Sequence, residues 1–355
     1  MPTTTRRAPV EGVACPTPIP AHDRVQLGHG SGGKMSAHLL RERFLPRFAN
    51  PYLEDLGDGA LVPVEGREVV ISTDTFVVSP LEVPGGNIGH LAVHGTVNDL
   101  AMMGATPKYL SAGFVLEEGL DFGVLDRVLD AMAEASAACG VQIVTGDTKV
   151  VDRGKADGLF VNTTGIGFLS EGFRPAPTRA RPGDVVLVSG PLGRHGMAIM
   201  AAREGLAFEA DIESDTASLA PLVESLRVDV GAAVHCLRDA TRGGLASALN
   251  EIARASGVGV ELSGALPVPG AVEAACEMLG LDPLYVANEG VLVAFVAPEA
   301  GEGALAALRA HAVGSSAARV GRVVDAHRGM VVLRTGLGGT RVVDMLPGDQ
   351  LPRIC

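Results

Sequence analysis

Short apolar stretches that end in turns of glycine and aspartate recur in both halves of this 355-residue chain. Residues 68–72 lead into Ser-Thr-Asp-Thr, residues 141–145 into Gly-Asp-Thr-Lys, and residues 184–189 into a glycine-rich turn before a helical segment. Apolar runs of this length, bounded by turn residues, are typical of strands that alternate with helices. The chain is therefore expected to be a mixed α/β protein, with residues 141–145 as a buried strand.

Two blocks of this pattern flank an irregular stretch with three prolines, residues 171–182. Because proline and glycine interrupt regular structure, we expect a domain boundary there, between a first domain at residues 23–170 and a second at residues 171–345. Residues 1–22, rich in proline and threonine, predict a flexible arm, and residues 346–355 predict a mobile tail.

The same patterns predict individual elements inside the two blocks. Further strands are expected at residues 159–168, 291–296, 318–324 and 330–333. Helices are expected at residues 88–103, 124–138 and 245–255, and from Met197 onward, with Asn87 as the cap of the first.

Composition excludes several classes of protein. The net charge of −12 argues against a nucleic-acid or anionic-membrane partner, because such partners call for a basic face. Five cysteines without a CxxC pair favour a reduced, cytoplasmic protein over a disulfide framework or a zinc site. No run of 18 apolar residues occurs, and the N-terminus lacks the apolar core of a signal peptide, so we expect no membrane association.

Aspartates recur at the turns that close these elements. They are Asp58, Asp74, Asp99, Asp147 and Asp239. Mg²⁺ prefers hard oxygen ligands, so carboxylates from separate segments could hold Mg²⁺ on a nucleotide triphosphate. Aspartate is also a common turn residue, and each position alone has that simpler explanation. Asp99 is the exception, because it lies inside a predicted helix beside Asn98.

Two glycine-rich segments are candidates for phosphate contacts. Residues 28–34 (GHGSGGK) form a loop whose backbone N–H groups could cradle phosphate, although Met35 after Lys34 excludes a Walker A motif. Thr241 opens the segment TRGG before a predicted helix, whose N-terminus could also receive phosphate. The alternative for TRGG is a loop with a surface arginine.

Cys355 differs from the other cysteines because it ends the chain behind Pro347 and Pro352. Nine extended residues span about 30 Å, so the thiol could move between an internal pocket and another protein. The alternative is an exposed cysteine without a role, although such a thiol is an oxidation liability. Cys139, Cys236 and Cys276 lie in apolar predicted helices and are expected in the core, whereas Cys15 in the arm is ambiguous.

These segments together resemble the HypE family, the carbamoyl dehydratases of nickel–iron hydrogenase maturation. More broadly, they resemble the PurM-like superfamily of aminoimidazole ribonucleotide synthetase and selenophosphate synthetase. The matching stretches cover residues 24–355 and include GHGSGGKMSAHLL, TGDTKVV, LRDATRGGLASALNEIA, ANEG and LPRIC, of which the LPRIC ending is the specific part. Ala240 departs from the proline that superfamily members often carry before TRGG, without loss of a functional group.

The resemblance implies a reaction on the terminal thiol. HypF would place a carbamoyl group on Cys355, ATP would phosphorylate its oxygen, and loss of phosphate and a proton would leave a thiocyanate. The cyano group would then pass to iron held by a HypC–HypD complex. By the same resemblance, Glu289 would be the base, Lys149 the cation that steadies charge or relays a proton, and Asp58, Asp99 and Asp239 the Mg²⁺ ligands.

The resemblance also implies two PurM-like α/β domains, with the sheet of the first domain paired across a homodimer and ATP bound along that domain. The residues expected to bind ATP are Gly32, Gly33, Lys34, Asp74, Asn98, Asp147, Thr148 and Thr241.

Two alternatives remain open on the sequence. A selenophosphate synthetase-like enzyme would place cysteine or selenocysteine near the N-terminal glycine-rich loop, and residues 28–34 hold neither. A non-enzymatic carrier would display a modified thiol and bind ATP only for structure.

Overall fold

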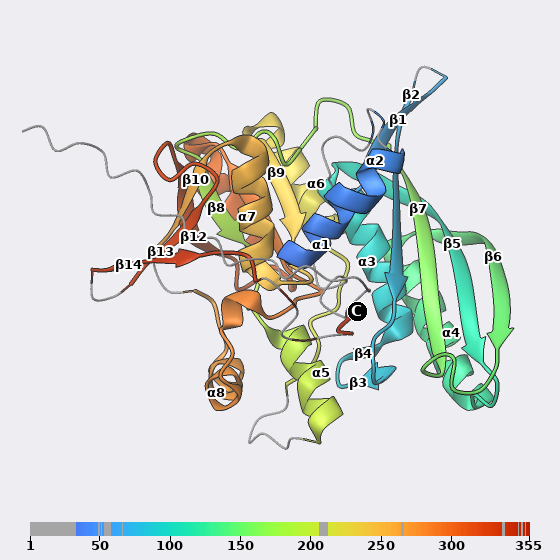
Figure 1. Ribbon diagram of the computed structural model, residues 1–355. Helices are drawn as coiled ribbons and strands as arrows, with labels where there is room; N and C mark the ends of the chain where they lie inside the picture. The colour runs from blue at the N-terminus through green and yellow to red at the C-terminus, as the bar shows by residue number, and fades with distance from the viewer. Residues whose placement is uncertain are drawn as a thin grey trace, which may run out of the picture.

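The computed structural model describes residues 33–48, 50, 52, 58–65, 67–205, 212–263, 266–335, 338–346, 348, 351 and 353–355. The predicted N-terminal arm, Cys15 and Gly32 lie outside these residues. Two large sheets, each accompanied by helices, and one two-stranded sheet form the described part of the chain, so the predicted mixed α/β fold is confirmed (Figure 1). Within the described part of the chain, none of the helices is both long and apolar enough to cross a bilayer.

The first sheet has the strand order β1-β2-β7-β5-β6. Its strands are β1 (Ala60–Val64), β2 (Arg67–Phe76), β5 (Ala105–Glu117), β6 (Gln142–Val151) and β7 (Leu159–Leu169). Helices α3 (Ile88–Met102) and α4 (Phe122–Cys139) lie beside this sheet, next to the small hairpin of β3 (Glu82–Val83) and β4 (Gly86–Asn87). Asn87 caps α3 as predicted, since its side chain accepts the backbone N–H groups of Gly89 and His90.

The prediction of a buried strand at residues 141–145 is wrong in one respect. The segment is a strand, but β6 is the edge of the sheet, and its residues are exposed apart from the half-buried Val151. Ile143 and Val144 are 40% and 58% exposed. An apolar run predicts that a strand is covered, but it does not say whether the cover comes from the same chain or from another.

The second sheet has the order β14-β13-β10-β12-β8-β11-β9. Its strands are β8 (Val185–Val188), β9 (Val234–Asp239), β10 (Gly259–Leu262), β11 (Leu292–Val296), β12 (Ala318–Val324), β13 (Val331–Arg334) and β14 (Thr340–Val343). The accompanying helices are α5 (Arg194–Glu204), α6 (Ala220–Asp229), α7 (Gly244–Ser256), α8 (Gly270–Leu279) and α9 (Gly301–Arg309). Cys236 is buried as predicted, but it lies in strand β9 and not in a helix.

Before the first sheet, a short helical stretch runs through α1 (Lys34–Leu39), η2 (Leu40–Phe44) and α2 (Leu45–Phe48). It lies across the front of the molecule, between the two sheets (Figure 1).

One hydrophobic core joins the two halves of the chain and also contains its last residues. Phe76 and Val97 of the first domain, Met197 of the second, and Ile354 and Cys355 belong to the same buried cluster. The C-terminus accordingly lies in the middle of the molecule, close to α3 and α5 (Figure 1). The structure therefore shows the tail with its end docked inside, and the predicted mobility of residues 346–355 stays a prediction.

Candidate active site

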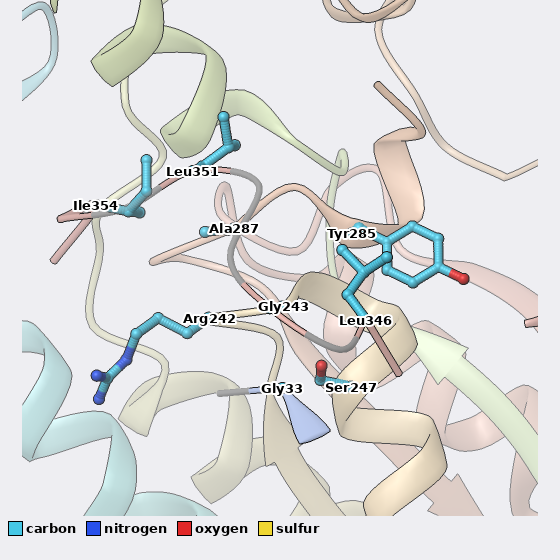
Figure 2. Close-up of a pocket in the computed structure, with 10 residues that line it drawn as sticks. Gly33, Arg242, Gly243, Ser247, Tyr285, Ala287, Leu346, Leu351 and Ile354 are labelled. Atoms are coloured by element: carbon cyan, nitrogen blue, oxygen red, sulfur yellow. The ribbon is translucent and has the colours of Figure 1, made fainter. Parts of the chain in front are cut away.

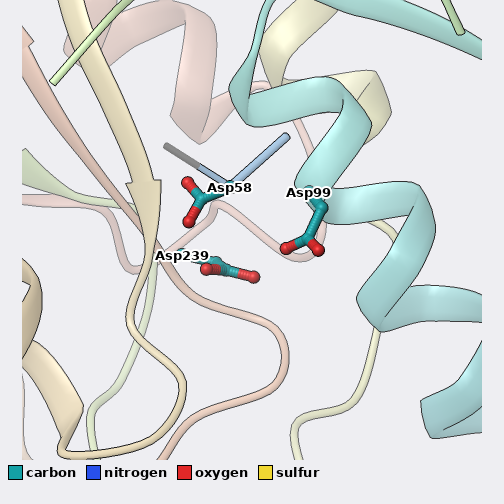
Figure 3. A group of neighbouring side chains, drawn as sticks. All are labelled: Asp58, Asp99 and Asp239. Atoms are coloured by element: carbon teal, nitrogen blue, oxygen red, sulfur yellow. The ribbon is translucent and has the colours of Figure 1, made fainter. Parts of the chain in front are cut away.

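Three aspartates from distant parts of the sequence meet between the two domains (Figure 3). Asp58 precedes β1, Asp99 lies on α3, and Asp239 ends β9. One carboxylate oxygen from each lies within 4.8 Å of the others. The structure thus brings together the three residues that the resemblance assigned to Mg²⁺.

The electrostatics of this cluster favour a bound cation. Burial raises the pKa of Asp58 to about 6, although Arg238, whose Nη1 lies 3.0 Å from Asp58 Oδ1, lowers it. Burial, followed by the charge of Asp58, raises the pKa of Asp239 to about 8. Burial and then the charge of Asp239 raise the pKa of Asp99 well above its usual value. Three carboxylates, that of Asp239 buried and the other two half-buried, lie near one arginine and provide the hard oxygen donors that Mg²⁺ prefers.

Glu289 lies beside this cluster, fully inside the protein. The residue is 3% exposed, and its Oε1 has no hydrogen-bond partner among the residues that the structure describes. Burial, and then the charges of Asp239 and Asp74, raise the pKa of Glu289 well above its usual value. The backbone N–H of Glu289 donates to Asp215 Oδ1 at 3.0 Å, which fixes the segment that carries it. A buried carboxyl group with one unpartnered oxygen is suited to take a proton from a substrate.

Arg242 is the functional candidate that the sequence reasoning missed. Its Nη2 lies 3.7 Å from Asp74 Oδ1, so an arginine of the second domain reaches a strand of the first. Charge on Cys355 is the largest cause that raises the pKa of Arg242, and the charges of Asp74 and Glu289 add to it. The guanidinium therefore lies within electrostatic reach of the thiol residue and the candidate base. The motif TRGG was visible in the sequence, but a surface arginine explained it equally well.

Cys355 is 7% exposed and is held through its backbone. The N–H of Val77 donates to a terminal carboxylate oxygen of Cys355 at 3.0 Å, and the N–H of Ser79 donates to the carbonyl of Arg353 at 3.4 Å. The end of the tail therefore runs antiparallel to residues 77–79, which follow β2.

Behind the tail lies a pocket that the tail itself helps to close (Figure 2). Leu351 and Ile354 of the tail line it, together with Gly33 and with Arg242 and Gly243 of the TRGG segment. Figure 2 shows the Arg242 side chain extending away from these residues, toward the first domain. The tail thus covers a space that both glycine-rich segments border.

The predicted phosphate contacts Lys34 and Thr241 lie near this pocket. Lys34 Nζ pairs with Asp344, and its backbone N–H donates to the carbonyl of Leu346 at 2.9 Å. These bonds tie the N-terminal glycine-rich segment to the root of the tail. Thr241 lies in the turn before α7, where its carbonyl accepts the N–H of Gly244 at 2.9 Å.

Asn98 is 1% exposed and its side chain is occupied by backbone groups. Its Oδ1 accepts the N–H of Leu219 at 2.7 Å, and its Nδ2 donates to the carbonyl of Ala217 at 3.0 Å. Asn98 therefore links α3 by hydrogen bonds to the loop that leads to α6.

Asp147, Thr148 and Lys149 are not brought to this cluster within one chain. They lie on exposed edge strand β6, where Lys149 pairs with Asp147. Asp147 is three strands away from Thr75, the neighbour of Asp74, through Gly113 and Asn162. Three inter-strand spacings correspond to about 14 Å.

The two α/β domains, with a carboxylate cluster between them, place this chain in the class of AIR synthase-related proteins. The family model "AIR synthase related protein, N-terminal domain" matches residues 56–169, and the corresponding C-terminal domain model matches residues 181–334. The chain is 51% identical over 336 residues to "Carbamoyl dehydratase HypE" of Rhizobium leguminosarum bv. viciae, covering 94% of this chain and 96% of that protein.

Solved structures lead to the same family. A HypE–HypF complex matches with a TM-score of 0.83 at 45% identity, over 87% of this chain and 99% of that one. HypE in complex with ATP matches with a TM-score of 0.79 at 50% identity, over 93% and 99%. The chain belongs to the HypE family of carbamoyl dehydratases, as its motifs predicted.

Proposed function

We propose that this chain uses ATP to dehydrate a carbamoyl group carried on the thiol of Cys355, giving a thiocyanate that supplies cyanide in nickel–iron hydrogenase maturation. One observation carries the proposal beyond the family relationship. Cys355, which would carry the substrate, is buried, and its charge raises the pKa of Arg242. The charge of Glu289 raises the pKa of Arg242 as well. A carrier that only displayed its thiol would gain nothing from this arrangement.

The reaction needs the carbamoyl oxygen to become a leaving group. In the thiocarbamate S–C(=O)–NH₂, the oxygen attacks the terminal phosphoryl group of ATP, the bond between that group and ADP breaks so that ADP leaves, and the nitrogen loses one proton. The C–O bond then breaks, phosphate departs, and loss of the second N–H proton completes the C≡N bond. We assign the proton acceptor to Glu289, because its raised pKa makes its carboxylate a stronger base than an exposed glutamate.

Arg242 would supply the permanent positive charge beside the reacting group. It remains protonated, since its pKa is raised, and it is already oriented by Asp74. A preorganised cation in a buried site stabilises developing negative charge more than a solvated one does. This role is independent of the proton transfer to Glu289.

Asp58, Asp99 and Asp239 would hold Mg²⁺, which when bound neutralises phosphate charge. We propose that Asp74, Thr241, Gly33 and Lys34 border the nucleotide and that Asn98 positions α3 beside it; Gly32, also proposed, lies outside the described residues.

We further propose that the chain works as a homodimer. Ile71, Ile166 and Tyr109 are paired across β2, β7 and β5, and each is 36–41% exposed. An apolar row across the open face of a sheet is suited to a second sheet. In such a dimer, strand β6 would lie near the paired sheets. We propose that Asp147 and Thr148 on β6 then contact ATP, and that Lys149 steadies charge or relays a proton.

The proposed partners follow from the chemistry and the relatives. HypF, seen with HypE in a solved complex, would load the thiol, and a HypC–HypD complex would accept the cyano group, all in the cytoplasm. No nucleic-acid or membrane partner is proposed.

The test follows the tail by mass. The protein is incubated with HypF, carbamoyl phosphate and ATP, and the C-terminal peptide is analysed by mass spectrometry. It should gain one carbamoyl group and then lose the mass of one water, whereas Cys355→Ala should do neither. A tail that stays carbamoylated with ATP present would leave only the carrier alternative.

A further inference from the structure

Helix α5 presents two polar side chains to the backbone of the docked tail. His195 Nε2 lies 2.9 Å from the carbonyl oxygen of Ile354, and Arg203 Nη2 lies 2.8 Å from that of Arg353. Arg203 also donates to the carbonyl of Ser79, beside which the tail runs. Residues eight positions apart share one face of a helix, so α5 holds two successive peptide units of the tail.

The contacts of His195 show which of its ring nitrogens carries a hydrogen. A carbonyl only accepts hydrogen bonds, so Nε2 carries the hydrogen, and Nδ1 accepts the hydroxyl of Ser214, whose oxygen is 2.8 Å away. Ser214 Oγ in turn accepts the N–H of Thr216 at 3.2 Å. His195 is fully buried, and burial lowers its pKa to about 4. The ring is therefore a neutral donor at physiological pH, fixed from both sides.

This bond restrains the residue next to the reacting group. The carbonyl of Ile354 belongs to the peptide unit that joins Ile354 to Cys355, so its orientation helps to set the direction and depth of the Cys355 side chain. None of these bonds involves sulfur. These main-chain bonds therefore do not depend on which group the sulfur carries.

We propose that His195 is a positioning residue for the dehydration: its Nε2–H holds the Ile354–Cys355 peptide so that the group on sulfur faces Glu289 and Arg242. The role concerns only the inward state of the tail. Loading by HypF requires the buried sulfur to leave this seat, so His195 supports dehydration and opposes loading. The catalytic part of this inference rests on the proposed function, whereas the seating of the tail does not.

The first experiment measures the seating without any catalysis. Full-length protein is treated with iodoacetamide, and alkylation of Cys355 is followed by peptide mass spectrometry. His195→Leu removes the donor and should speed alkylation roughly 5- to 10-fold, the effect of losing one buried hydrogen bond. His195→Gln, which offers an amide donor, should stay nearer to the parent rate.

The matched control is His235→Gln. His235 is also a buried histidine, but its ring bonds to Asp184 in the second domain and to none of the tail residues that the structure describes. Its Cys355 alkylation rate should equal that of the parent. If His195→Leu also alkylates at the parent rate, or if His235→Gln is accelerated equally, the seating role is overturned.

The second experiment separates the two half-reactions. In a single turnover from carbamoylated protein with saturating ATP, His195→Leu should form thiocyanate roughly 10-fold more slowly, with rescue by His195→Gln. HypF-dependent carbamoylation should be unchanged or faster. Equal slowing of both half-reactions would indicate a general folding defect and overturn the proposal. A parent protein that forms no thiocyanate would instead overturn the proposed function, and the alkylation assay would still decide the seating.

Discussion

Arg242 and Asp74 form an ion pair between the two domains, with Nη2 and Oδ1 3.7 Å apart. Arg242 belongs to the turn before α7 of the second domain, and Asp74 to β2 of the first. Neither domain alone contains the proposed site, because the carboxylate cluster is also shared between them. The docked tail lies against the same junction. The proposed chemistry therefore depends on how the two domains and the tail are assembled.

Replacement of Arg242 tests the proposed cation. Arg242→Ala should lower the single-turnover rate of thiocyanate formation roughly 100-fold, because one preorganised charge is lost from a buried site. Arg242→Lys should recover part of this loss. Arg227→Ala, which removes an arginine paired with Glu224 at the surface, should leave the rate unchanged. A parent-like rate for Arg242→Ala would contradict the assignment.

Glu289→Gln tests the proposed base. The amide keeps the size of the side chain but cannot accept a proton readily, so thiocyanate formation should fall by roughly 10²- to 10⁴-fold. Carbamoylation by HypF should persist, which separates loss of chemistry from loss of folding. Glu302→Gln on α9, a change at an exposed position, serves as the control. The interpretation fails if Glu289→Gln dehydrates at the rate of this control.

Asp239→Asn should change stability in a pH-dependent way. The folded-state pKa of Asp239, about 8, exceeds the ordinary aspartate pKa of 3.8, so the folded protein binds the proton more tightly than the unfolded chain. Stability from this group is then present at low pH and lost as the pH rises through about 8. Without Mg²⁺, Asp239→Asn should raise the melting temperature by roughly a few degrees above pH 8, and by less near pH 4.

With Mg²⁺ present, the parent protein should have the higher melting temperature and Asp239→Asn the lower one. Mg²⁺ should raise the melting temperature of the parent at pH 8, and addition of EDTA should cancel the rise, because the cation compensates the buried carboxylates. Asp239→Asn should respond much less. An equal response of both proteins to Mg²⁺ would exclude Asp239 as a ligand.

Val144→Asp tests the proposed dimer. Val144 is 58% exposed on edge strand β6, and a charge there should weaken pairing with a second sheet. Sedimentation should show a shift toward the monomer, accompanied by lower dehydratase activity because Lys149 depends on the paired state. Val228→Asp is the matched control, since Val228 is 64% exposed on α6. Parent-like sedimentation of Val144→Asp at low protein concentration would count against this surface.

Much of the secondary structure followed from local signals. Asn87 caps α3 because its side chain can accept the first free N–H groups, and this depends only on neighbouring residues. The strand expected at residues 318–324 has those bounds in β12. The sequence also singled out Cys355, whose position at the end of the chain is independent of folding. Cys236 was assigned to a helix, because an apolar run of that length does not distinguish a buried helix from a buried strand.

The sequence by itself therefore determined the α/β class, the family, and the residues that offer carboxylates and a terminal thiol. Only the tertiary structure decided which of them meet. Asp58, Asp99 and Asp239 converge because the start of β1, helix α3 and the end of β9 meet between the domains, whereas Asp147 and Lys149 remain on an outer edge. Arg242 and His195 acquired significance only through contacts with residues more than 100 positions away. The physical reason is that hydrogen bonds and charge interactions act over a few ångströms of space, and separation along the chain does not reveal that distance.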